Sequence, residues 1–428
     1  MASRDTDVLI VGAGQAGASA AAALRDFGYP GRILIVGAEQ ALPYERPPLS
    51  KAMLAGSGAV SDILIHPAGF HAEKGVETLL GVAVSSLDVQ GRTATLSDGA
   101  RTTWRHCLIA TGGQARSVAG LTPGAARVHY LRTIADALRL REAMRQHRSV
   151  LVVGGGFLGL EVASTARTLG LSATVLESAD RLLGRVMPPA LSRWLREAVC
   201  AAGVDLRLDA RCEAFDVHAD GVVVTLASGE TVSADMVVAA IGLVPEVGLA
   251  RRAGLKIHPD NGGIAVNERC ETSAPGVYAA GDCSSQHHPF VDAEIRLESW
   301  QNANEQARLV AAAIAGQPAA ALTAPWFWSD QFGANLQILG VPVPGLEYHC
   351  RGEPGDGDTA GKFLLLGAND AGQILHAIAV NAGGELRMLK PLVDSRTPCD
   401  PLALCDAASP LRQQVRAALA RTPSPTLS

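Results

Sequence analysis

The sequence has few aromatic residues, little net charge and no concentration of charge of one sign. Aromatic residues make up 4% of its 428 residues, charged residues 18%, and the formal net charge is −5 at pH 7. So small and so balanced a charge predicts no basic surface for nucleic acid, which we do not expect as a partner. The hydrophobic fraction of 48% is ordinary for a globular protein and excludes disorder for most of the chain. At about 100–200 residues per domain, the length predicts two to four domains.

The cysteines form no pair with metal-ligand spacing. No Cys-x-x-Cys occurs among the eight, which are Cys107, Cys200, Cys212, Cys270, Cys283, Cys350, Cys399 and Cys405. This pattern supports neither a zinc ribbon nor a dense disulfide framework. We interpret these residues mostly as reduced thiols and predict no metal site.

Long apolar runs are also missing. The run from Val150 to Leu160 ends at a charge, well short of the roughly 18 residues that a membrane helix needs. The stretch from Val8 to Leu24 has the composition of a signal-peptide core, but Asp5 and Asp7 precede it and glycines interrupt it. We therefore expect no membrane partner and a cytoplasmic location.

One sequence pattern occurs twice at domain scale. Each copy has a short apolar strand, a glycine loop, a helix and a second apolar strand, which together form a β-α-β unit. The first copy uses residues 8–11, the loop 12–17, a helix to about Gly28, and 33–36; the second uses 150–153, the loop 154–159, a helix to about Gly170, and 173–176. Each copy continues through hairpin turns to an apolar strand that ends in glycine, at Gly112 and at Gly242. The repeat predicts two nucleotide-binding domains.

A different pattern follows Gly242. Residues 277–282 predict one more buried strand that runs into a glycine-acid turn, and 300–315 predict a helix. Short strands are expected from Trp326 to about Val380, and a frayed tail at 422–428.

The glycine loops predict two dinucleotide sites. In this pattern the first glycine allows a tight turn, the second lets the backbone approach a pyrophosphate, and the third lets helix and strand pack closely. The pyrophosphate then lies at the helix N-terminus, where unpaired amides and the helix dipole favour negative charge. A single loop of this kind is weak evidence, but both copies lie between a strand and a helix.

An acidic residue follows each loop at the spacing expected for recognition of a ribose. Glu39 lies 22 residues after Gly17, and Glu177 lies 18 residues after Gly159. The alternative for each is a solvated strand end. A carboxylate at Glu177 accepts hydrogen bonds from a free ribose 2′-hydroxyl and repels a 2′-phosphate, which favours NAD over NADP. Arg181 and Arg185 either weaken that preference or are simply solvated.

With these pieces in place, the sequence resembles the FAD-dependent pyridine nucleotide-disulfide oxidoreductases. Within that superfamily it is similar to the ferredoxin reductases of bacterial aromatic-ring dioxygenase and cytochrome P450 systems. The resemblance covers nearly the whole chain, and it rests on the segments 12–17, 46–51, 110–113 with Arg116, 154–161, 280–282, 298–301 and 325–331. The strings Arg-Pro-Pro-Leu-Ser-Lys and Trp-Phe-Trp-Ser-Asp-Gln are its most specific parts.

The resemblance implies an α/β fold with two Rossmann-like, glutathione reductase-like nucleotide-binding domains and an α+β C-terminal interface domain. The FAD-binding domain is expected at 5–115 and 240–321, the NAD-binding domain at 116–239, the interface domain at 322–410 and a tail at 411–428. The implied FAD-binding residues are Gly12, Gly14, Gln15, Ala16, Gly17, Glu39, Arg46, Lys51, Ala110, Thr111, Gly112, Arg116, Gly281, Asp282, Ser299 and Trp300. The implied NAD-binding residues are Gly154, Gly156, Phe157, Leu158, Gly159, Glu161, Glu177, Arg185, Ile241 and Gly242.

The sequence departs from the family pattern at two positions. Ala38 replaces an acid that is frequent in the family, which leaves Glu39 alone to recognise the adenosine ribose. Glu246 follows Pro245 where Asn is common, and this puts little else in doubt.

No cysteine precedes Cys107, whereas disulfide reductases of the superfamily carry a cysteine pair just after the first nucleotide-binding unit, and peroxide or coenzyme A-linked members keep one cysteine there. Here that region holds residues 46–51. Electrons therefore need another exit from the flavin, and single-electron transfer to a [2Fe–2S] ferredoxin supplies one. The resemblance implies that Lys51 and Glu161 meet beside the flavin ring. The alternatives are a solvated lysine and an acid in the first turn of a helix.

Trp326 and Trp328 lie two residues apart, so their side chains share one face of an extended strand. They are either core aromatics or, as the resemblance implies, residues near the flavin edge that face the ferredoxin. Arg387, Lys390 and Arg396 form a candidate basic rim for an acidic ferredoxin, although each alone is interpreted as an ordinary surface charge.

We therefore predict an NADH-dependent, FAD-containing ferredoxin–NAD(+) reductase that feeds a terminal oxygenase. One alternative is an NADH oxidase, or a partner of rubredoxin or nitrite reductase, on the same scaffold. Another is an NADH-sensing binding protein similar to apoptosis-inducing factor. The resemblance allows both a monomer and a homodimer.

Overall fold

The computed structural model describes residues 4–421, which divide into two compact units. Unit 1 comprises the described part of 1–46, together with 59–114 and 243–322. Unit 2 comprises 47–58, 115–242 and the described part of 323–428. The chain passes between the units close to the expected boundaries of the nucleotide-binding domains. Residues 47–58, which we expected in the FAD-binding domain, group with unit 2.

A largely parallel sheet of seven strands forms the core of unit 1. Its order is β3-β2-β1-β6-β5-β4, and β18 also pairs with β6. The first half of β6 pairs antiparallel with β5, and its second half pairs parallel with β18. The strands are β1 (Arg4–Val11), β2 (Ile33–Gly37), β3 (Val76–Leu80), β4 (Val84–Asp88), β5 (Thr93–Leu96), β6 (Arg101–Ile109) and β18 (Val277–Ala279).

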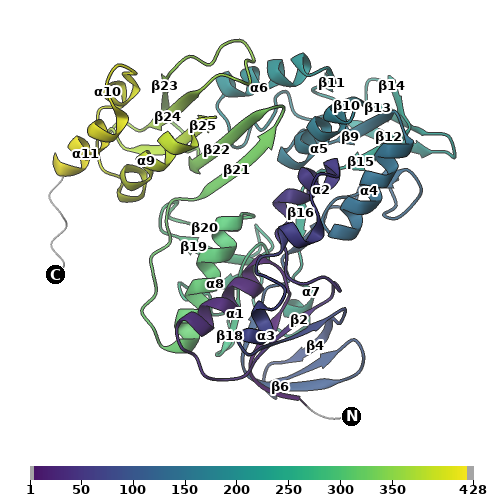
Figure 1. Ribbon diagram of the computed structural model, residues 1–428, viewed down its shortest axis with the longest axis vertical. Helices are drawn as coiled ribbons and strands as arrows, with labels where there is room; N and C mark the ends of the chain where they lie inside the picture. Colours follow the sequence, from purple (N-terminus) through teal and green to yellow (C-terminus); the bar gives the residue numbers. More distant parts are fainter. Residues whose placement is uncertain (1–3, 422–428) are drawn as a thin grey trace. The chain divides into compact units, whose positions relative to one another are not determined.

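Two helices of unit 1 pack against each other although they are far apart in sequence. Helix α1 (Gln15–Asp26) lies beside α8 (Trp300–Ala315), as Figure 1 shows. Alanines fill most of the buried face of α1, so the two helices approach closely. The smaller elements of the unit are η2 (Val60–Ile63), α3 (Phe70–Glu73), β7 (Gly113–Ala115, whose last residue belongs to unit 2), β16 (Leu243–Pro245), α7 (Gly248–Arg252), β17 (Ile264–Val266), β19 (Ser284–His288) and β20 (Ala293–Ile295).

Unit 2 contains a second parallel sheet, of order β11-β10-β9-β15-β8. Its central strands β9 and β15 are almost fully buried, as expected for a sheet covered on both faces. Its elements are β8 (Val128–His129), β9 (Ser149–Val153), β10 (Ser172–Leu176), β11 (Val204–Arg207), β15 (Met236–Ala239), α4 (Ile134–Gln146), α5 (Phe157–Thr168) and α6 (Pro189–Ala201). The hairpins expected at Asp220–Gly221 and Ser228–Gly229 join β12 (Cys212–Val217), β13 (Val222–Leu226) and β14 (Thr231–Ala234).

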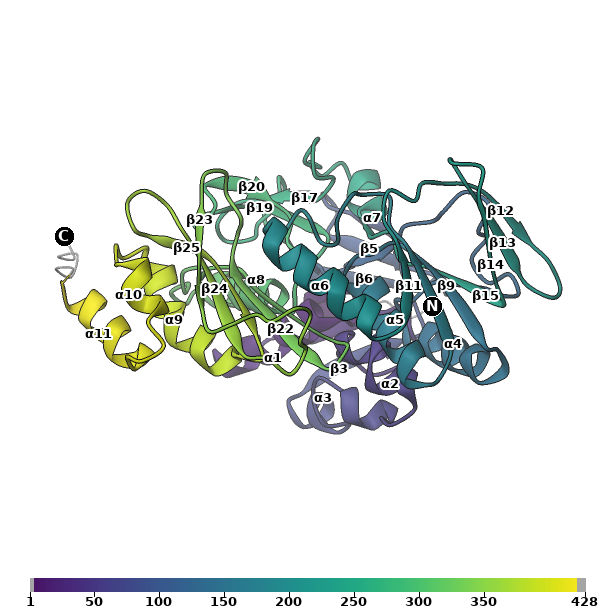
Figure 2. The ribbon, with the colours of Figure 1, turned by 90° about the horizontal axis from the view of Figure 1, so that it is seen from above.

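The C-terminal part of unit 2 is an antiparallel sheet of order β21-β22-β25-β24-β23. Helix α9 packs on β22 and β25, and α10 packs on β23 (Figure 2). The elements are β21 (Trp326–Gln331), β22 (Ala334–Gly340), β23 (Glu347–Arg351), β24 (Phe363–Ala368), β25 (Ile374–Val380), α9 (Gly383–Ser395), α10 (Pro401–Cys405) and α11 (Leu411–Arg421). The segment 47–58 adds a 3₁₀ turn, η1 (Pro47–Ser50), and α2 (Ala52–Ala55) to the unit.

Part of the segment that we expected as a tail is helical. Helix α11 spans 411–421 and buries Leu411, Val415 and Ala418. These residues recur every three to four positions, which places them on one helical face that packs on α9. Residues 422–428 lie outside the described part of the chain.

None of the helices within residues 4–421 combines the length and the apolar character that spanning a bilayer requires.

Candidate functional site

The first glycine loop lies between β1 and α1 and has no room for side chains at two positions. Gly12 has φ +116°, and a Cβ there would overlap the carbonyl oxygen of Ala110. A Cβ on Gly17 would overlap the carbonyl oxygen of Gly12. At Gly14 the space is open, and no side chain caps the N-terminus of α1. The N–H groups of the first helical turn, including Gln15 and Ala16, therefore form a cradle that fits a pyrophosphate.

The second glycine loop repeats this arrangement between β9 and α5. Gly154 has φ +108°, and a Cβ on Gly159 would overlap the carbonyl oxygen of Gly154. Gly156 caps α5 without a side-chain hydrogen bond, and the space around it is open. The next residues, Phe157 and Leu158, begin the helix. This loop therefore also fits a pyrophosphate.

Glu39, just after β2, forms a cluster with two residues that lie a few positions further on. Its carboxylate accepts hydrogen bonds from the hydroxyl of Tyr44 at 2.5 Å and from the guanidinium of Arg46 at 2.9 Å. Burial opposes the charge on Arg46, but Tyr44, Glu39 and Asp282 outweigh it and raise the pKa of Arg46. Glu39 and Arg46, which were predicted separately, thus lie together, and the sequence did not indicate Tyr44.

The strand-end turn at Ala110–Gly112 is held by Glu246, one of the two departures from the family pattern. The hydroxyl of Thr111 donates to the carbonyl oxygen of Glu246 at 2.6 Å, and the N–H of Glu246 donates to Gly112 at 2.9 Å. The Glu246 carboxylate accepts from Gln114 at 2.7 Å. The backbone of residue 246 therefore fastens the loop after β6, and the acidic side chain adds a bond to Gln114.

Helix α8 holds the glycine-acid turn through amide side chains. The N–H of Gly281 donates to Gln306 at 2.8 Å, and Asn302 donates to the same Gln306 oxygen at 3.2 Å. Gln306 is 2% exposed and Asn302 5%. The sequence analysis missed both, because polar residues in a helix normally predict a solvated face. The carbonyl oxygen of Asp282 accepts from Arg296 at 3.2 Å.

Ser299 and Trp300, which the resemblance implies for FAD, begin α8. The Ser299 hydroxyl accepts from the N–H of Asn302 at 3.1 Å, and so caps the helix. The indole of Trp300 donates to the carboxylate of Glu45 at 3.2 Å and its ring is 37% exposed.

In unit 2, Glu177 follows β10 and contacts the second glycine loop directly. One carboxylate oxygen accepts from the N–H of Gly155 at 2.8 Å, and the other accepts from Ala179 at 2.9 Å. Arg181 is bound to the carbonyl oxygens of Met187 and Gly184, at 2.7 and 2.8 Å. Arg185 is exposed. The carboxylate therefore contacts the loop directly, while Arg181 binds carbonyl groups of the segment 184–187.

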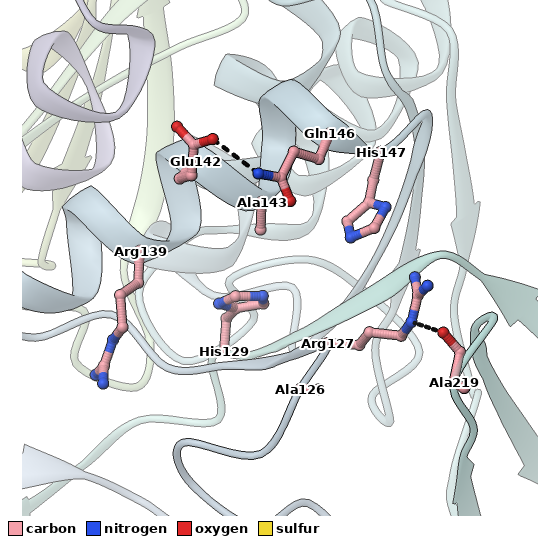
Figure 3. Close-up of a pocket in the computed structure, with 9 residues that line it drawn as sticks. All are labelled: Ala126, Arg127, His129, Arg139, Glu142, Ala143, Gln146, His147 and Ala219. Carbon is pink, nitrogen blue, oxygen red and sulfur yellow. Dashed lines mark hydrogen bonds between the residues drawn. The ribbon is translucent and has the colours of Figure 1, made fainter.

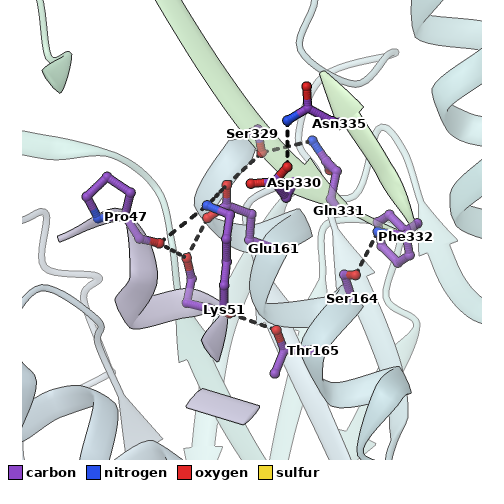
Figure 4. Close-up of polar contacts among 11 residues, drawn as sticks. Pro47, Lys51, Glu161, Ser164, Thr165, Ser329, Asp330, Gln331, Phe332 and Asn335 are labelled. Atoms are coloured by element: carbon purple, nitrogen blue, oxygen red, sulfur yellow. Dashed lines mark hydrogen bonds and ion pairs between the residues drawn. The ribbon is translucent and has the colours of Figure 1, made fainter. Parts of the chain in front are cut away.

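Lys51 and Glu161 form an ion pair, with 2.8 Å between Nζ and Oε1 (Figure 4). Their side chains are 21% and 8% exposed, so Lys51 is not a solvated lysine. Glu161 lies beyond the first turn of α5, which contains no acidic residue. Glu161 also accepts from the hydroxyls of Ser50 at 2.5 Å and Ser329 at 2.6 Å. The pattern of α5 offered no signal for these two serines, because they come from η1 and β21.

The Trp326 and Trp328 rings stack on one face of β21, with centroids 5.0 Å apart and planes at 21°. Both rings are half-buried, so they are neither fully buried core aromatics nor fully exposed residues of a docking surface. The opposite face of β21 packs on α5, where Phe327 contacts Phe157 at a centroid distance of 4.6 Å. The strand therefore carries different groups on its two faces.

The candidate basic rim of Arg387, Lys390 and Arg396 carries less net positive charge than the sequence of these three residues indicated. The ammonium group of Lys390 lies 2.7 Å from the carboxylate of Asp394 within α9, which offsets its charge. Arg387 is exposed on the same helix, and Arg396 ends it with φ +49°.

Arg116, Ile241 and Gly242 are further predicted residues, and they lie in unit 2. The backbone N–H of Arg116 donates to Gly242 at 2.9 Å, and Ile241 is 38% exposed. A surface cavity of about 420 Å³ lies between the start of β8 and the second half of α4 (Figure 3). None of the predicted site residues lines it.

All eight cysteines are free thiols. Cys107, Cys270 and Cys283 are fully buried, and burial raises the pKa of each, which makes them poor nucleophiles. Residues 4–421 hold no group of three or more acidic, histidine or cysteine side chains arranged for a metal ion.

The two cradles, each on a β-α-β unit and each followed by an acid, define an oxidoreductase that binds two dinucleotides. The chain also matches the family model described as pyridine nucleotide-disulphide oxidoreductase over residues 6–307, and the model described as reductase C-terminal over 326–415. The chain belongs to the pyridine nucleotide-disulphide oxidoreductase family. Its cofactors are FAD and NAD(H), and the fold class predicted from the sequence is confirmed.

Similar proteins come from electron-transfer systems. The ferredoxin–NAD(+) reductase component of the 3-phenylpropionate/cinnamic acid dioxygenase of Photorhabdus laumondii is 36% identical over 390 residues, 91% of this chain and 96% of that protein. Putidaredoxin reductase of Pseudomonas putida is 35% identical over 424 residues, 98% of this chain and 99% of that protein.

Solved structures that match this chain also come from electron-transfer systems. The covalent complex of putidaredoxin reductase with putidaredoxin contains a chain that matches with a TM-score of 0.91 and 34% identity, over 97% of this chain and 99% of that one. The ferredoxin reductase for the CYP199A2 system of Rhodopseudomonas palustris matches with a TM-score of 0.89 and 33% identity, over 95% and 99%.

Proposed function

We propose that this protein is an NADH-dependent ferredoxin reductase that serves an oxygenase system. The net reaction takes one NADH and two oxidised [2Fe–2S] ferredoxins to NAD(+), two reduced ferredoxins and a proton. Bound FAD supplies the conversion between a two-electron hydride and single electrons. The names of the relatives support ferredoxin as the acceptor.

The observation that carries the proposal is the arrangement of β21. One face of this strand holds Glu161, the partner of Lys51, through Ser329, and the other face presents the stacked Trp326 and Trp328. A single rigid strand thus connects the charged pair with an aromatic surface suited to a protein partner, since half-exposed tryptophans are typical anchors of interfaces.

Residues of the chain have separate roles in this proposal. The N–H groups of the first turn of α5 bind the NADH pyrophosphate, and Glu177 accepts from the 2′-hydroxyl of its ribose. The first turn of α1 binds the FAD pyrophosphate, with Glu39 on the adenosine ribose and Arg46 neutralising charge. Lys51 would place a positive charge beside bound FAD and so favour the negative charge that reduction brings, and Glu161 orients the lysine.

The experiment is anaerobic titration of the purified yellow protein with NADH and with NADPH, followed by cytochrome c reduction with and without a [2Fe–2S] ferredoxin. We expect bleaching far faster with NADH, and reduction that depends on the ferredoxin. Oxygen consumption at the full turnover rate without a carrier would assign an NADH oxidase instead. Slow turnover with every acceptor, with a change in oligomeric state on adding NADH, would assign a sensor.

We also propose a cytoplasmic location, because NADH is a cytoplasmic reductant.

A further inference from the structure

The Glu161 carboxylate is held by donors that all lie outside its own helix. Lys51 and Ser329 reach Oε1 at 2.8 and 2.6 Å, and Ser50 reaches Oε2 at 2.5 Å. The side chain is only 8% exposed, so these three groups replace the water that a carboxylate otherwise binds. Glu161 therefore depends on η1 and on β21 for its position.

We propose that Ser329 is a positioning residue that ties the Lys51–Glu161 pair to β21, so that binding of NAD(H) beside the pair affects the strand that carries Trp326 and Trp328. This inference rests on the proposed function, because it assigns the pair to the path of the hydride.

The hydrogen bonds around Ser329 indicate that its hydroxyl proton is donated to Glu161. Ser329 is fully buried, and its Oγ accepts from the Gln331 amide at 3.3 Å. A serine hydroxyl has a single proton, and an ionised carboxylate only accepts, so that proton points to Glu161 (Figure 4). The bond is charge-assisted, which makes it roughly twice as strong as a bond between neutral groups.

Strand geometry ties this bond to the tryptophans. Side chains alternate along β21, so Ser329 faces α5 while its neighbour Trp328 faces away. Two further contacts fasten β21 and the turn that follows it to α5: the Phe327 ring on Phe157, and the N–H of Phe332, just after the strand, on the hydroxyl of Ser164 at 2.7 Å. Of these contacts, only that of Ser329 ends on the carboxylate that pairs with Lys51.

Ser164 therefore offers a matched control. Ser164→Ala removes one serine hydrogen bond between α5 and β21, as Ser329→Ala does, but it leaves Glu161 with all three donors. Ser329→Thr keeps the hydroxyl. The three variants separate loss of packing between α5 and β21 from loss of the bond to the carboxylate.

The first measurement is stopped-flow reduction of the flavin by NADH in the full-length holoenzyme. Ser329→Ala should lower the limiting reduction rate about 10-fold, the scale set by one hydrogen bond to a charged group, and change the Kd of NADH by less than about 3-fold. Ser329→Thr should stay within about 3-fold of the wild-type rate, and Ser164→Ala within about 2-fold. An unchanged rate in Ser329→Ala, equal losses in Ser329→Ala and Ser164→Ala, or no rescue by threonine would overturn the proposal.

The second measurement does not depend on catalysis. Hydrogen exchange of the β21 amides is compared with and without NAD(+). We expect NAD(+) to change the exchange in the wild type and in Ser164→Ala, but not in Ser329→Ala; the same response in all three would refute the link. Both measurements omit ferredoxin, so they remain valid if the acceptor is another molecule, and the acceptor assay remains valid if Ser329 proves to be structural.

Discussion

The backbone N–H of Gly155 donates a 2.8 Å hydrogen bond to the carboxylate of Glu177, which ties the second glycine loop to the end of β10. The acid that we propose selects the cofactor thus also supports the loop that we propose binds it. Since the carboxylate lies beside the loop, a ribose 2′-phosphate would bring two negative charges close together.

Replacement of Glu177 by Gln should therefore weaken the preference for NADH. The variant keeps the size of the side chain and loses its charge, so we expect kcat/KM for NADPH relative to NADH to rise about 10-fold, which corresponds to about 1.4 kcal/mol. The assay is ferricyanide reduction with each nucleotide. Glu213→Gln, an exposed position on β12, is the charge-matched control and should leave the ratio unchanged. A ratio unaltered in Glu177→Gln would assign cofactor choice to other residues.

The two glycines of the α5 loop should respond differently to alanine. A Cβ at Gly159 would overlap the Gly154 carbonyl, whereas at Gly156 it meets no atom within 4 Å. We expect Gly159→Ala to destabilise the protein by about 1–3 kcal/mol, as overpacking does. Gly156→Ala should keep its denaturation midpoint but raise the KM for NADH about 10-fold or more, because the methyl occupies the cradle of the pyrophosphate. Gly384→Ala, another open position, is the control for both; equal effects at Gly156 and Gly384 would contradict the assignment.

Glu161→Gln should slow hydride transfer, and it should also lower the thermal midpoint of the apoprotein, because the ion pair that it breaks is mostly buried. The amide retains most of the packing but leaves the Lys51 ammonium without its anion. Because a charged hydrogen bond contributes about 1.5–3 kcal/mol, we expect flavin reduction to slow by about 10–100-fold. Glu142→Gln, at an exposed pair with Arg145 on α4, should have no effect. A wild-type reduction rate in Glu161→Gln would remove the pair from the mechanism.

Trp328→Ala should impair ferredoxin reduction alone. It removes one ring of the stack on the face of β21 opposite α5 and leaves Ser329 in place. Truncation of an interface aromatic typically costs about 1–2 kcal/mol or more, so we expect the KM for ferredoxin to rise about 5–30-fold. Ferricyanide reduction, which needs no docking surface, should stay constant, and Trp328→Phe should recover part of the loss. A parallel loss of both activities would place Trp328 at the hydride step instead.

Local sequence pattern predicted the parts of the fold that depend on neighbouring residues. The strands at 33–36 and 150–153, the helix at 300–315 and the hairpin at Asp220–Gly221 all appear within a residue or two of the expected bounds. Apolar runs, glycine positions and turn dipeptides are local signals. Helix α11 was not predicted, since its three buried residues are diluted by charged and alanine positions.

The residues of the candidate site also fall into those that a local motif predicts and those that depend on tertiary packing. Gly12, Gly17 and Glu39 occur at fixed spacings along one unit, so their positions follow from a motif. Ser50 and Ser329 donate to Glu161 across 111 and 168 residues, and Gln306 of α8 accepts from Gly281, which lies 25 residues earlier in the chain. Pairings of this kind depend on tertiary packing, which no local pattern encodes. Tyr44 is nearer in sequence to Glu39, but a tyrosine in a loop carries no specific signal.

Buried histidines should make the protein acid-sensitive below neutral pH. Burial lowers the pKa of His376 to about 4, and burial with the neighbouring His287 lowers that of His288 to about 4. In the unfolded chain each should titrate near about 6.5, so between these values the unfolded state binds more protons and the free energy of unfolding falls as the pH falls. Each histidine should cost about 2 kcal/mol between pH 7.5 and 5.0, and almost nothing above pH 7.5.

Urea denaturation at pH 8.5, 7.5 and 5.0 measures this effect. Wild-type protein should have the same midpoint at the two higher pH values and a much lower one at pH 5.0. His376→Gln retains a partner for the Tyr348 hydroxyl, which lies 2.8 Å from Nδ1 of His376. The variant should therefore lose about 2 kcal/mol less than the wild type between pH 7.5 and 5.0, even if it is less stable at both. An identical pH dependence in the two proteins would show that His376 takes up its proton in the folded state, against the burial of its ring.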